Sequence, residues 1–383
     1  MNIVIAIDSF KGSLASLEAG EAVHTGIRKV FPQAETLVLP LADGGEGTVE
    51  ALTRGLGGRF REVSVTGPLG EKVTARYGIL PDNKTAVMEM AAAAGLPLVP
   101  EGQRNPLHTT TFGVGEMLLD AMGKGCRHFI LGIGGSATND GGLGMLQALG
   151  YDMLDEKGSP VPQGALGLER LSRIGDEHVV PVLKECTFQI ACDVNNPLCG
   201  PLGCSAVFAP QKGASAADIA KMDKWLENYA SLSRAKYPKA DPATPGAGAA
   251  GGLGFAFLAY TEAALEPGIN IVLRETKLEE HIKKAALVIT GEGRLDGQTI
   301  MGKAPIGVAA LAKKHGKPVI AFSGCATPEA RLCNEHGIDA FFPVLRQVVT
   351  LEEAMEKGTA RQNLTDTAEQ AMRLLKLGKY FRN

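Results

Sequence analysis

A lysine between two serines follows an apolar run near the N-terminus. The run, residues 3–7, has the composition of a buried parallel strand, and the stretch after it contains Ser9, Lys11 and Ser13. Ligands of open α/β sheets bind beyond the carboxyl ends of the strands. A lysine supplies a compact positive charge for a phosphate or a carboxylate, and serine hydroxyls can donate to the same anion. We therefore predict that these residues bind an anionic substrate; a solvated loop with a capping serine is the alternative.

Two acids lie in a glycine-rich stretch after the next predicted strand. Residues 41–48 contain Asp43 and Glu46 together with three glycines. Carboxylate oxygens in such a turn suit Mg²⁺ or a substrate hydroxyl. A tight turn before a helix that begins at Thr48 would explain part of the pattern, but three glycines in four positions exceed what a turn needs. Asp43 and Glu46 are therefore candidate metal ligands.

The glycine-rich stretch at residues 132–142 gives the strongest signal. It follows a strand-like segment, residues 128–133, and precedes a predicted helix that extends to Leu149. Glycines let backbone amides approach a ligand closely, and the polar side chains here add donors. The pattern predicts a cradle for nucleotide phosphates, with candidate ligands Gly134, Gly135, Ser136, Thr138 and Asn139.

The same stretch also fits the dinucleotide-binding fingerprint. Gly132, Gly134 and Ala137 have the required spacing, and Asp152 lies about 20 residues farther along the chain. A dinucleotide does not need the polar extension after Ala137, however, and the fingerprint alone is weak evidence. The sequence has no Gly-x4-Gly-Lys-Ser/Thr motif, so a kinase with this stretch would not be a P-loop enzyme.

A carboxylate and an amide follow another apolar run, residues 187–191. Asp193 could serve as a base or a metal ligand, and Asn195 as a contact with the substrate. An Asx turn before Pro197 explains the same residues without any function.

Charged residues are also concentrated in a predicted loop, residues 290–303, that follows an apolar, strand-like run at residues 286–290. Arg294 and Lys303 can neutralise phosphate charge, and Lys303 is a candidate nucleotide ligand. Asp296 is a second candidate base or metal ligand. The candidates for substrate contacts in this stretch are Glu292 and Gln298.

The elements that must position these residues form two groups. Both ends of the chain alternate apolar runs with helical patterns, which predicts an open parallel, Rossmann-like sheet. The middle has three β-rich runs separated by turn residues, which indicates antiparallel pairing within a mixed α/β domain. We expect a parallel α/β domain from residues 1–60 and 285–383, an inserted domain from residues 61–284, and an active site in the cleft between them.

One glycine-rich segment of the middle part has two interpretations. Residues 245–254 fit either a flexible hinge or a helix N-terminus exposed to an anion.

Composition narrows the class of protein. The chain has 383 residues, 45% of them hydrophobic, which favours two domains with buried cores. A formal net charge of −3 and the lack of a basic run argue against a nucleic-acid-binding protein. Seven cysteines without a Cys-x-x-Cys pair indicate free thiols in a reducing, cytoplasmic setting. We expect no signal peptide and no membrane span, and the sequence is compatible with an oligomer.

Taken together, these stretches resemble the type 1 glycerate kinase family in order and over nearly the whole chain. Cys204 stands where such proteins are expected to have alanine. The matching stretches are residues 8–13, 42–48, 132–142, 193–198, 209–213, 245–254, 291–298 and 302–303.

The resemblance implies an activity that composition and spacing do not show. It implies transfer of phosphate from ATP to D-glycerate with Mg²⁺, and the product of bacterial members is usually the 2-phosphate. In this scheme Lys11, Arg294 and Lys303 hold phosphates or the glycerate carboxylate, and Asp193 or Asp296 is the base. The alternatives are an NAD-dependent dehydrogenase of a small hydroxy acid and a non-catalytic sensor of sugar acids.

Overall fold

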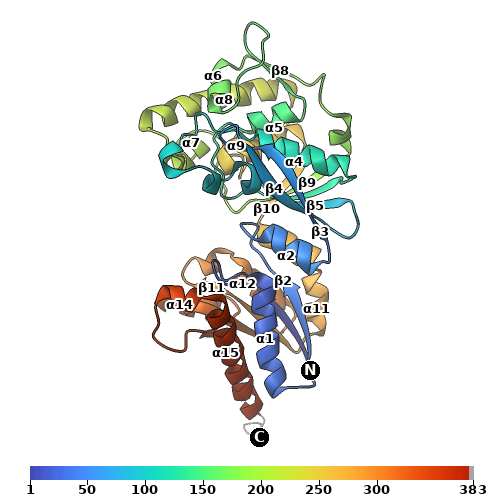
Figure 1. Cartoon of the computed structure of the whole chain (residues 1–383), viewed down its shortest axis with the longest axis vertical. Helices are drawn as coiled ribbons and strands as arrows, with labels where there is room; N and C mark the ends of the chain where they lie inside the picture. Colours follow the sequence, from blue (N-terminus) through green and yellow to red (C-terminus); the bar gives the residue numbers. More distant parts are fainter. Residues whose placement is uncertain (379–383) are drawn as a thin grey trace. The chain divides into compact units, whose positions relative to one another are not determined.

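A computed structural model describes residues 1–378, which form two compact units, each with its own sheet (Figure 1). The first unit contains residues 1–43, 50–56 and the chain from Ile269 onward, and the second contains residues 44–49 and 57–268. The chain thus returns to the first unit at Ile269 and not at residue 285. The reason is that α11 (Leu278–Lys284) packs against the first strand and against α12 (Ala304–Lys314).

The first unit is built on a five-stranded parallel sheet with the order β13-β12-β11-β1-β2. This confirms the open parallel sheet predicted from both chain ends. The strands are β1 (Asn2–Ile7), β2 (Glu35–Pro40), β11 (Leu287–Leu295), β12 (Val319–Ala326) and β13 (Ala340–Pro343).

One strand of this sheet is longer than the sequence predicts. The apolar run of β11 ends at Thr290, but the strand continues through the residues expected to form a loop. Glu292 pairs with Ser323 and Arg294 pairs with Cys325 of β12. Gly291 permits this pairing because a Cβ there would lie 2.0 Å from the carbonyl oxygen of Phe322. The charged residues are therefore fixed on a strand.

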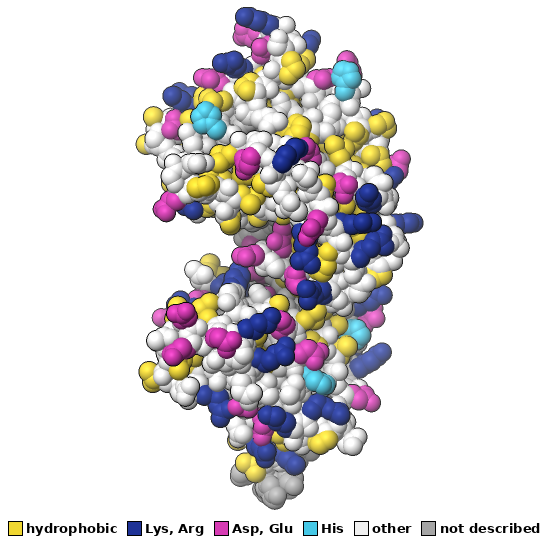
Figure 2. Space-filling view, viewed as in Figure 1, with side chains coloured by type: hydrophobic (Ala, Val, Ile, Leu, Met, Phe, Trp, Pro, Cys, Tyr) yellow, Lys and Arg dark blue, Asp and Glu magenta, His cyan; other side chains and the backbone are white. Residues whose placement is uncertain are grey.

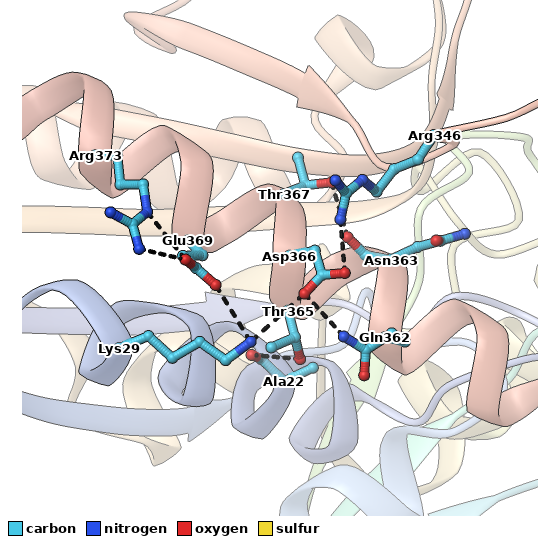
Figure 3. A network of polar contacts seen from close by, with 10 residues as sticks. All are labelled: Ala22, Lys29, Arg346, Gln362, Asn363, Thr365, Asp366, Thr367, Glu369 and Arg373. Atoms are coloured by element: carbon cyan, nitrogen blue, oxygen red, sulfur yellow. Dashed lines mark hydrogen bonds and ion pairs between the residues drawn. The ribbon is translucent and has the colours of Figure 1, made fainter.

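Two long helices pack side by side on the first sheet: α1 (Ser16–Val30) and α15 (Lys357–Leu377). A Cβ on Gly26 would lie 2.3 Å from the carbonyl oxygen of Thr365, so glycine permits the close contact. Lys29 places its Nζ 3.5 Å from Asp366 and 3.2 Å from Glu369 across the helix pair (Figure 3). The unit also contains α2 (Thr48–Gly55), α10 (Gly268–Glu275), α13 (Leu332–Glu335) and α14 (Leu351–Met355).

The second unit has a mixed six-stranded sheet with the order β10-β9-β6-β5-β4-β3. The pairs β3–β4 and β4–β5 are antiparallel, as predicted, and the other pairs are parallel. The strands are β3 (Arg59–Thr66), β4 (Lys72–Ile79), β5 (Thr85–Glu89), β6 (His128–Gly132), β9 (Thr187–Ala191) and β10 (Glu262–Glu266); β7 (Asp152–Leu154) and β8 (Arg173–Gly175) form a separate hairpin.

The helices of the second unit bury one large apolar core against this sheet. They are α3 (Ala91–Ala94), α4 (Phe112–Gly123), α5 (Leu143–Ala148), α6 (Ala165–Arg170), α7 (Cys204–Phe208), α8 (Ala216–Lys236) and α9 (Ala249–Tyr260).

The glycine-rich segment at residues 245–254 is mostly buried at the start of α9. Gly251 and Gly252 have φ values of +67° and +90°, which L side chains rarely adopt. A Cβ on Gly251 would lie 2.1 Å from the carbonyl oxygen of Thr138. The segment therefore packs tightly against the stretch at residues 132–142, and it does not have the exposure of a flexible hinge.

The surface of the described residues carries both signs of charge. On the face drawn in Figure 2, Lys and Arg side chains lie among Asp and Glu side chains, in keeping with the small net charge. Within residues 1–378, no helix has the length and apolarity needed to span a membrane.

Candidate active site

The first unit has a cavity of about 370 Å³ at the carboxyl ends of β1, β11 and β12. This is the edge of a parallel sheet where ligands bind. Four carboxylates and three cations line the cavity, and apolar side chains form the rest of its wall. The charged residues are Asp8, Asp43, Glu292, Asp296, Lys11, Arg294 and Lys303.

Asp8 is the most buried carboxylate of this cavity, with an exposure of 7%. It directly follows β1; its amide donates to the carbonyl of Gly291 at 2.9 Å, and its Oδ1 accepts from the amide of Ser9 at 2.6 Å. Burial, followed by the nearby charges of Asp43 and Glu292, raises its pKa to about 7. Asp8 can therefore exchange a proton near neutral pH.

Two cations of the cavity are held by one carboxylate. The Oδ2 of Asp296 lies 3.4 Å from Nε of Arg294, and its Oδ1 lies 3.9 Å from Nζ of Lys303. The amide of Gln298 also donates to Oδ1 of Asp296 at 2.9 Å. Asp296 is thus placed to orient the two cations. The side chain of Gln298 is exposed and does not line the cavity.

Glu292 and Ser13 complete the polar lining of the same cavity. The hydroxyl of Thr299 donates to Oε1 of Glu292 at 2.7 Å, and burial is the main cause that raises the pKa of Glu292. The hydroxyl of Ser13 is buried and has no hydrogen-bond partner within residues 1–378. Since unpaired buried hydroxyls are costly, Ser13 is suited to a ligand. Ser9 also lines the cavity.

The structure separates the two predicted metal ligands. Asp43 lines the cavity of the first unit, whereas Glu46 is exposed and lines neither this cavity nor that of the second unit. Over the described part of the chain, no three His, Cys, Asp or Glu side chains are grouped so that they could hold a metal ion.

The second unit has its own cavity of about 330 Å³ at the carboxyl ends of β6 and β9. Gly134, Gly135 and Ser136 form one wall. Within residues 1–378, the amide groups of these three residues donate no hydrogen bond, and Gly135 has a φ of +72°. Successive free amides around a left-handed residue form a concave site for anions.

Other predicted ligands of this stretch lie outside the lining of the cavity. Thr138 and Asn139 are fully buried and do not line the cavity. The side-chain Nδ2 of Asn139 donates to the hydroxyl of Ser205 at 2.9 Å, which anchors the stretch to α7. Asn195 is exposed and also does not line the cavity, and Lys303 belongs to the cavity of the first unit.

Asp193 lines the cavity of the second unit directly after β9. Its Oδ1 accepts from the backbone amide of Gly268 at 3.2 Å, and Asp193 is not without other interactions. The two candidate bases, Asp193 and Asp296, therefore line cavities of different units.

Two functional candidates in the structure, Asp8 and Lys212, are not among the residues predicted from the sequence. Asp8 begins the stretch that contains Lys11, so its position after a strand could have identified it. Lys212 lies in the 3-10 helix η4 (Pro210–Lys212), lines the second cavity and is only 2% exposed. No local pattern marks a lysine in such a turn as buried.

The dinucleotide fingerprint lacks its structural context. That fingerprint requires a glycine-rich turn that leads directly from a strand into a helix, with an acid at the end of the next strand. Here a buried segment, residues 136–142, separates β6 from α5. Asp152 lies on the separate hairpin and contacts His178 at 2.8 Å.

Comparisons with known proteins point to one family. The profile of the "Glycerate kinase family" matches residues 3–376. The chain is 51% identical over 354 residues to "Glycerate 2-kinase" of Escherichia coli (strain K12), covering 92% of this chain and 93% of the relative. It is 48% identical to "Glycerate kinase" of Haemophilus influenzae, covering 98% and 99%.

A solved structure gives the same result for the fold. The crystal structure of putative glycerate kinase 2 from Salmonella typhimurium LT2 superposes with a TM-score of 0.92 at 48% identity and covers 99% of each chain. Nothing in these comparisons favours the dehydrogenase alternative. The chain belongs to the glycerate kinase family.

Proposed function

We propose that this protein transfers the γ-phosphoryl group of ATP to a hydroxyl group of D-glycerate, which gives phosphoglycerate and ADP. Apart from membership of the family, one observation supports this proposal. Three cations line the cavity of the first unit together with Asp8, a carboxylate whose pKa is raised to about 7 mainly by burial. A small hydroxy acid needs this combination, because its carboxylate must be bound and its hydroxyl must lose a proton.

In this proposal the first cavity binds the acid. Lys11, Arg294 and Lys303 attract its carboxylate, and Ser13 can donate a hydrogen bond to it. Asp8 accepts the proton of the attacking hydroxyl. We prefer Asp8 to Asp296 as the base because the carboxylate of Asp296 is already shared by two cations.

The second cavity binds the nucleotide in this proposal. The free amides of Gly134, Gly135 and Ser136 favour phosphate oxygens. Leu96, Ile133 and Phe208 are among the apolar residues of its wall, which suits a purine base. Because Asp193 lines this cavity, we assign it to the nucleotide and not to the acid.

We propose that Mg²⁺ arrives with the nucleotide. The described residues have no group of three side chains that could hold a metal ion by themselves. In kinases, Mg²⁺ is commonly bound by one or two carboxylates plus substrate phosphates, where it neutralises phosphate charge. Asp43, which lines the first cavity, is the proposed carboxylate of this chain, and Glu46, which lines neither cavity, is the weaker candidate.

The position of the phosphate in the product and the cellular location of the protein are also proposals. We propose 2-phosphoglycerate as the product, supported by the name of the E. coli relative, "Glycerate 2-kinase". We propose a cytoplasmic location, supported by seven cysteines that are all free thiols in the structure.

Purified protein should release ADP from ATP when D-glycerate is added and should release almost none without it. A coupled ADP assay over D-glycerate, L-glycerate, glycolate and lactate measures the activity and its specificity. ³¹P NMR of the product distinguishes the 2-phosphate from the 3-phosphate. If no hydroxy acid stimulates ADP release by well-folded protein, the proposed function is wrong.

The substitution Asp296→Asn should raise KM for glycerate by about 10-fold and change kcat by less than about 3-fold. The reason is that Asn cannot hold the charges of Arg294 and Lys303 in position. Steady-state kinetics measures both constants. Asp339→Asn is the matched control, because Asp339 also pairs with a lysine, Lys313, but does not line the cavity. A large loss of kcat at unchanged KM would instead identify Asp296 as the base.

Simultaneous binding of glycerate and a non-hydrolysable ATP analogue should reduce the radius of gyration. The proposed acid and nucleotide sites belong to different units, and the hydroxyl must reach the γ-phosphate, so we propose that the reaction takes place in a cleft that closes between the units. Small-angle X-ray scattering with no ligand, each ligand alone and both ligands measures the change. Identical scattering curves in all four samples would contradict closure.

A further inference from the structure

Lys212 is a lysine whose ammonium group is buried without an acidic partner. Its side chain is among the largest fully buried ones of the chain. Its Nζ donates to the hydroxyl of Ser136 at 2.7 Å and to the carbonyl of Thr138 at 2.6 Å, and both acceptors are neutral. Over residues 1–378, no carboxylate forms an ion pair with it. A third N–H of the ammonium group has no acceptor.

Burial of this ammonium group destabilises the folded protein when no ligand is bound. A buried charge without a charged partner is strongly destabilising, and burial accordingly lowers the pKa of Lys212 to about 8. Cys204 and Asp140 are the other titratable groups that act on it. Asp140, however, accepts hydrogen bonds from Thr111 and from the amide of Gly142. Within residues 1–378, Lys212 thus has no carboxylate in direct contact, and Asp140 favours its charged form only from farther away.

A negatively charged ligand in the cavity would supply the partner that the ammonium group of Lys212 lacks. Lys212 lines the same wall of the second unit as Gly134, Gly135 and Ser136, whose amides have no acceptor within the described residues. The ammonium group donates a hydrogen bond to the hydroxyl of Ser136, which lines the same cavity. One cation and three free amides together form a donor-rich site in this cavity, which Asp193 also lines. Such a site needs a ligand with several negatively charged oxygens.

We infer that Lys212 binds a phosphate oxygen of the nucleotide, together with the amides of Gly134 and Gly135. The inference rests on the proposed kinase function and assigns a residue to its nucleotide site. The chain has no P-loop lysine next to its glycine-rich stretch. Lys212, which lies 76 residues after Ser136 in sequence, supplies the cation that the stretch itself lacks.

The test compares two lysines. Lys212→Met should weaken binding of a non-hydrolysable ATP analogue about 30-fold or more, while its affinity for adenosine should change less than about 3-fold. Affinity for D-glycerate should also be unchanged. Isothermal titration calorimetry measures all three ligands. Lys221→Met is the matched control, because Lys221 is an exposed lysine of α8 that does not line the cavity. Its affinities should equal those of the unchanged protein.

Two results would overturn the inference. One is an unchanged affinity of folded Lys212→Met for the ATP analogue, and the other is a loss of glycerate affinity alone. Should the variant fail to fold, ¹⁵N NMR of lysine side chains in the unchanged protein replaces it. The Nζ resonance of Lys212 should shift with the ATP analogue and not with adenosine, and the absence of a shift contradicts the inference. Lack of glycerate-dependent ADP release by the unchanged protein would instead contradict the proposed function, since analogue binding is measured separately.

Discussion

Replacing Asp8 with asparagine is expected to lower kcat/KM for glycerate by about 10³-fold, which corresponds to about 4 kcal/mol of transition-state stabilisation. Asparagine keeps the shape of the side chain but cannot accept the proton of the attacking hydroxyl. The loss should be mainly in kcat, because Lys11, Arg294 and Lys303 still bind the carboxylate of the acid. Steady-state kinetics of ADP release measures both constants.

The same substitution should make the ligand-free protein more stable at pH 8. Burial favours the protonated form of Asp8, so its pKa rises from 3.8 to about 7 on folding. The folded protein then binds this proton more tightly than the unfolded chain does, and the contribution of Asp8 to the free energy of unfolding falls as pH rises from about 4 to about 7. Asp8→Asn should remove this pH dependence, which urea unfolding at several pH values measures.

A surface acid of the same unit provides the control for both measurements. Glu21→Gln removes one negative charge from the exposed side of α1 and should change neither the kinetics nor the pH dependence of stability. If Asp8→Asn keeps most of its kcat, Asp8 is not the base. If the variant keeps its kcat and is also less stable than the unchanged protein at pH 8, the inference that burial raises the pKa of Asp8 is wrong as well.

Replacing Gly134 with valine is expected to weaken binding of a non-hydrolysable ATP analogue about 100-fold, or about 2.7 kcal/mol, without destabilising the fold. A Cβ at Gly134 would have no atom within 4 Å and would need no left-handed backbone, so the folded chain tolerates it. Gly134 lines the cavity of the second unit, where the larger side chain would occupy space near the free amides. Calorimetry with the analogue and a thermal melt measure the two effects.

Gly102→Val is the matched control for this substitution. Gly102 is exposed, also has no atom within 4 Å of a Cβ, and does not line the cavity. Its nucleotide affinity should equal that of the unchanged protein. An unchanged affinity of the Gly134 variant for the analogue would show that these amides do not bind phosphate.

The fold of the first unit is largely predictable from local sequence. Short apolar runs such as residues 3–7 are buried on both faces of a parallel sheet, so their composition alone reveals them. The antiparallel strands of the second unit were also predictable, because turn residues separate β3, β4 and β5. The extension of β11 to Leu295 was not, since its glycines and charges resemble a loop until β12 pairs with them.

For the site, local sequence identified the stretches but not the role of each residue. Position near a strand end predicts four residues that do line one cavity: Lys11, Glu292, Arg294 and Asp296. Thr138 and Asn139 were selected for the same reason, yet packing against α7 and α9 buries them. A polar residue next to a strand can face a ligand or the core, and only tertiary contacts decide which.

The burial of Asp8 and Lys212 results from the tertiary structure and could not be predicted from local sequence. Neither burial nor a shifted pKa is a property of a residue type; both result from neighbours that are distant in sequence, such as Glu292 for Asp8 and Ser136 for Lys212. The sequence thus determined which chemical groups are present after each strand. The packing of strands and helices determined which of those groups lose their water, and the loss of water is what changes an ordinary carboxylate or ammonium group into a candidate for proton transfer or phosphate binding.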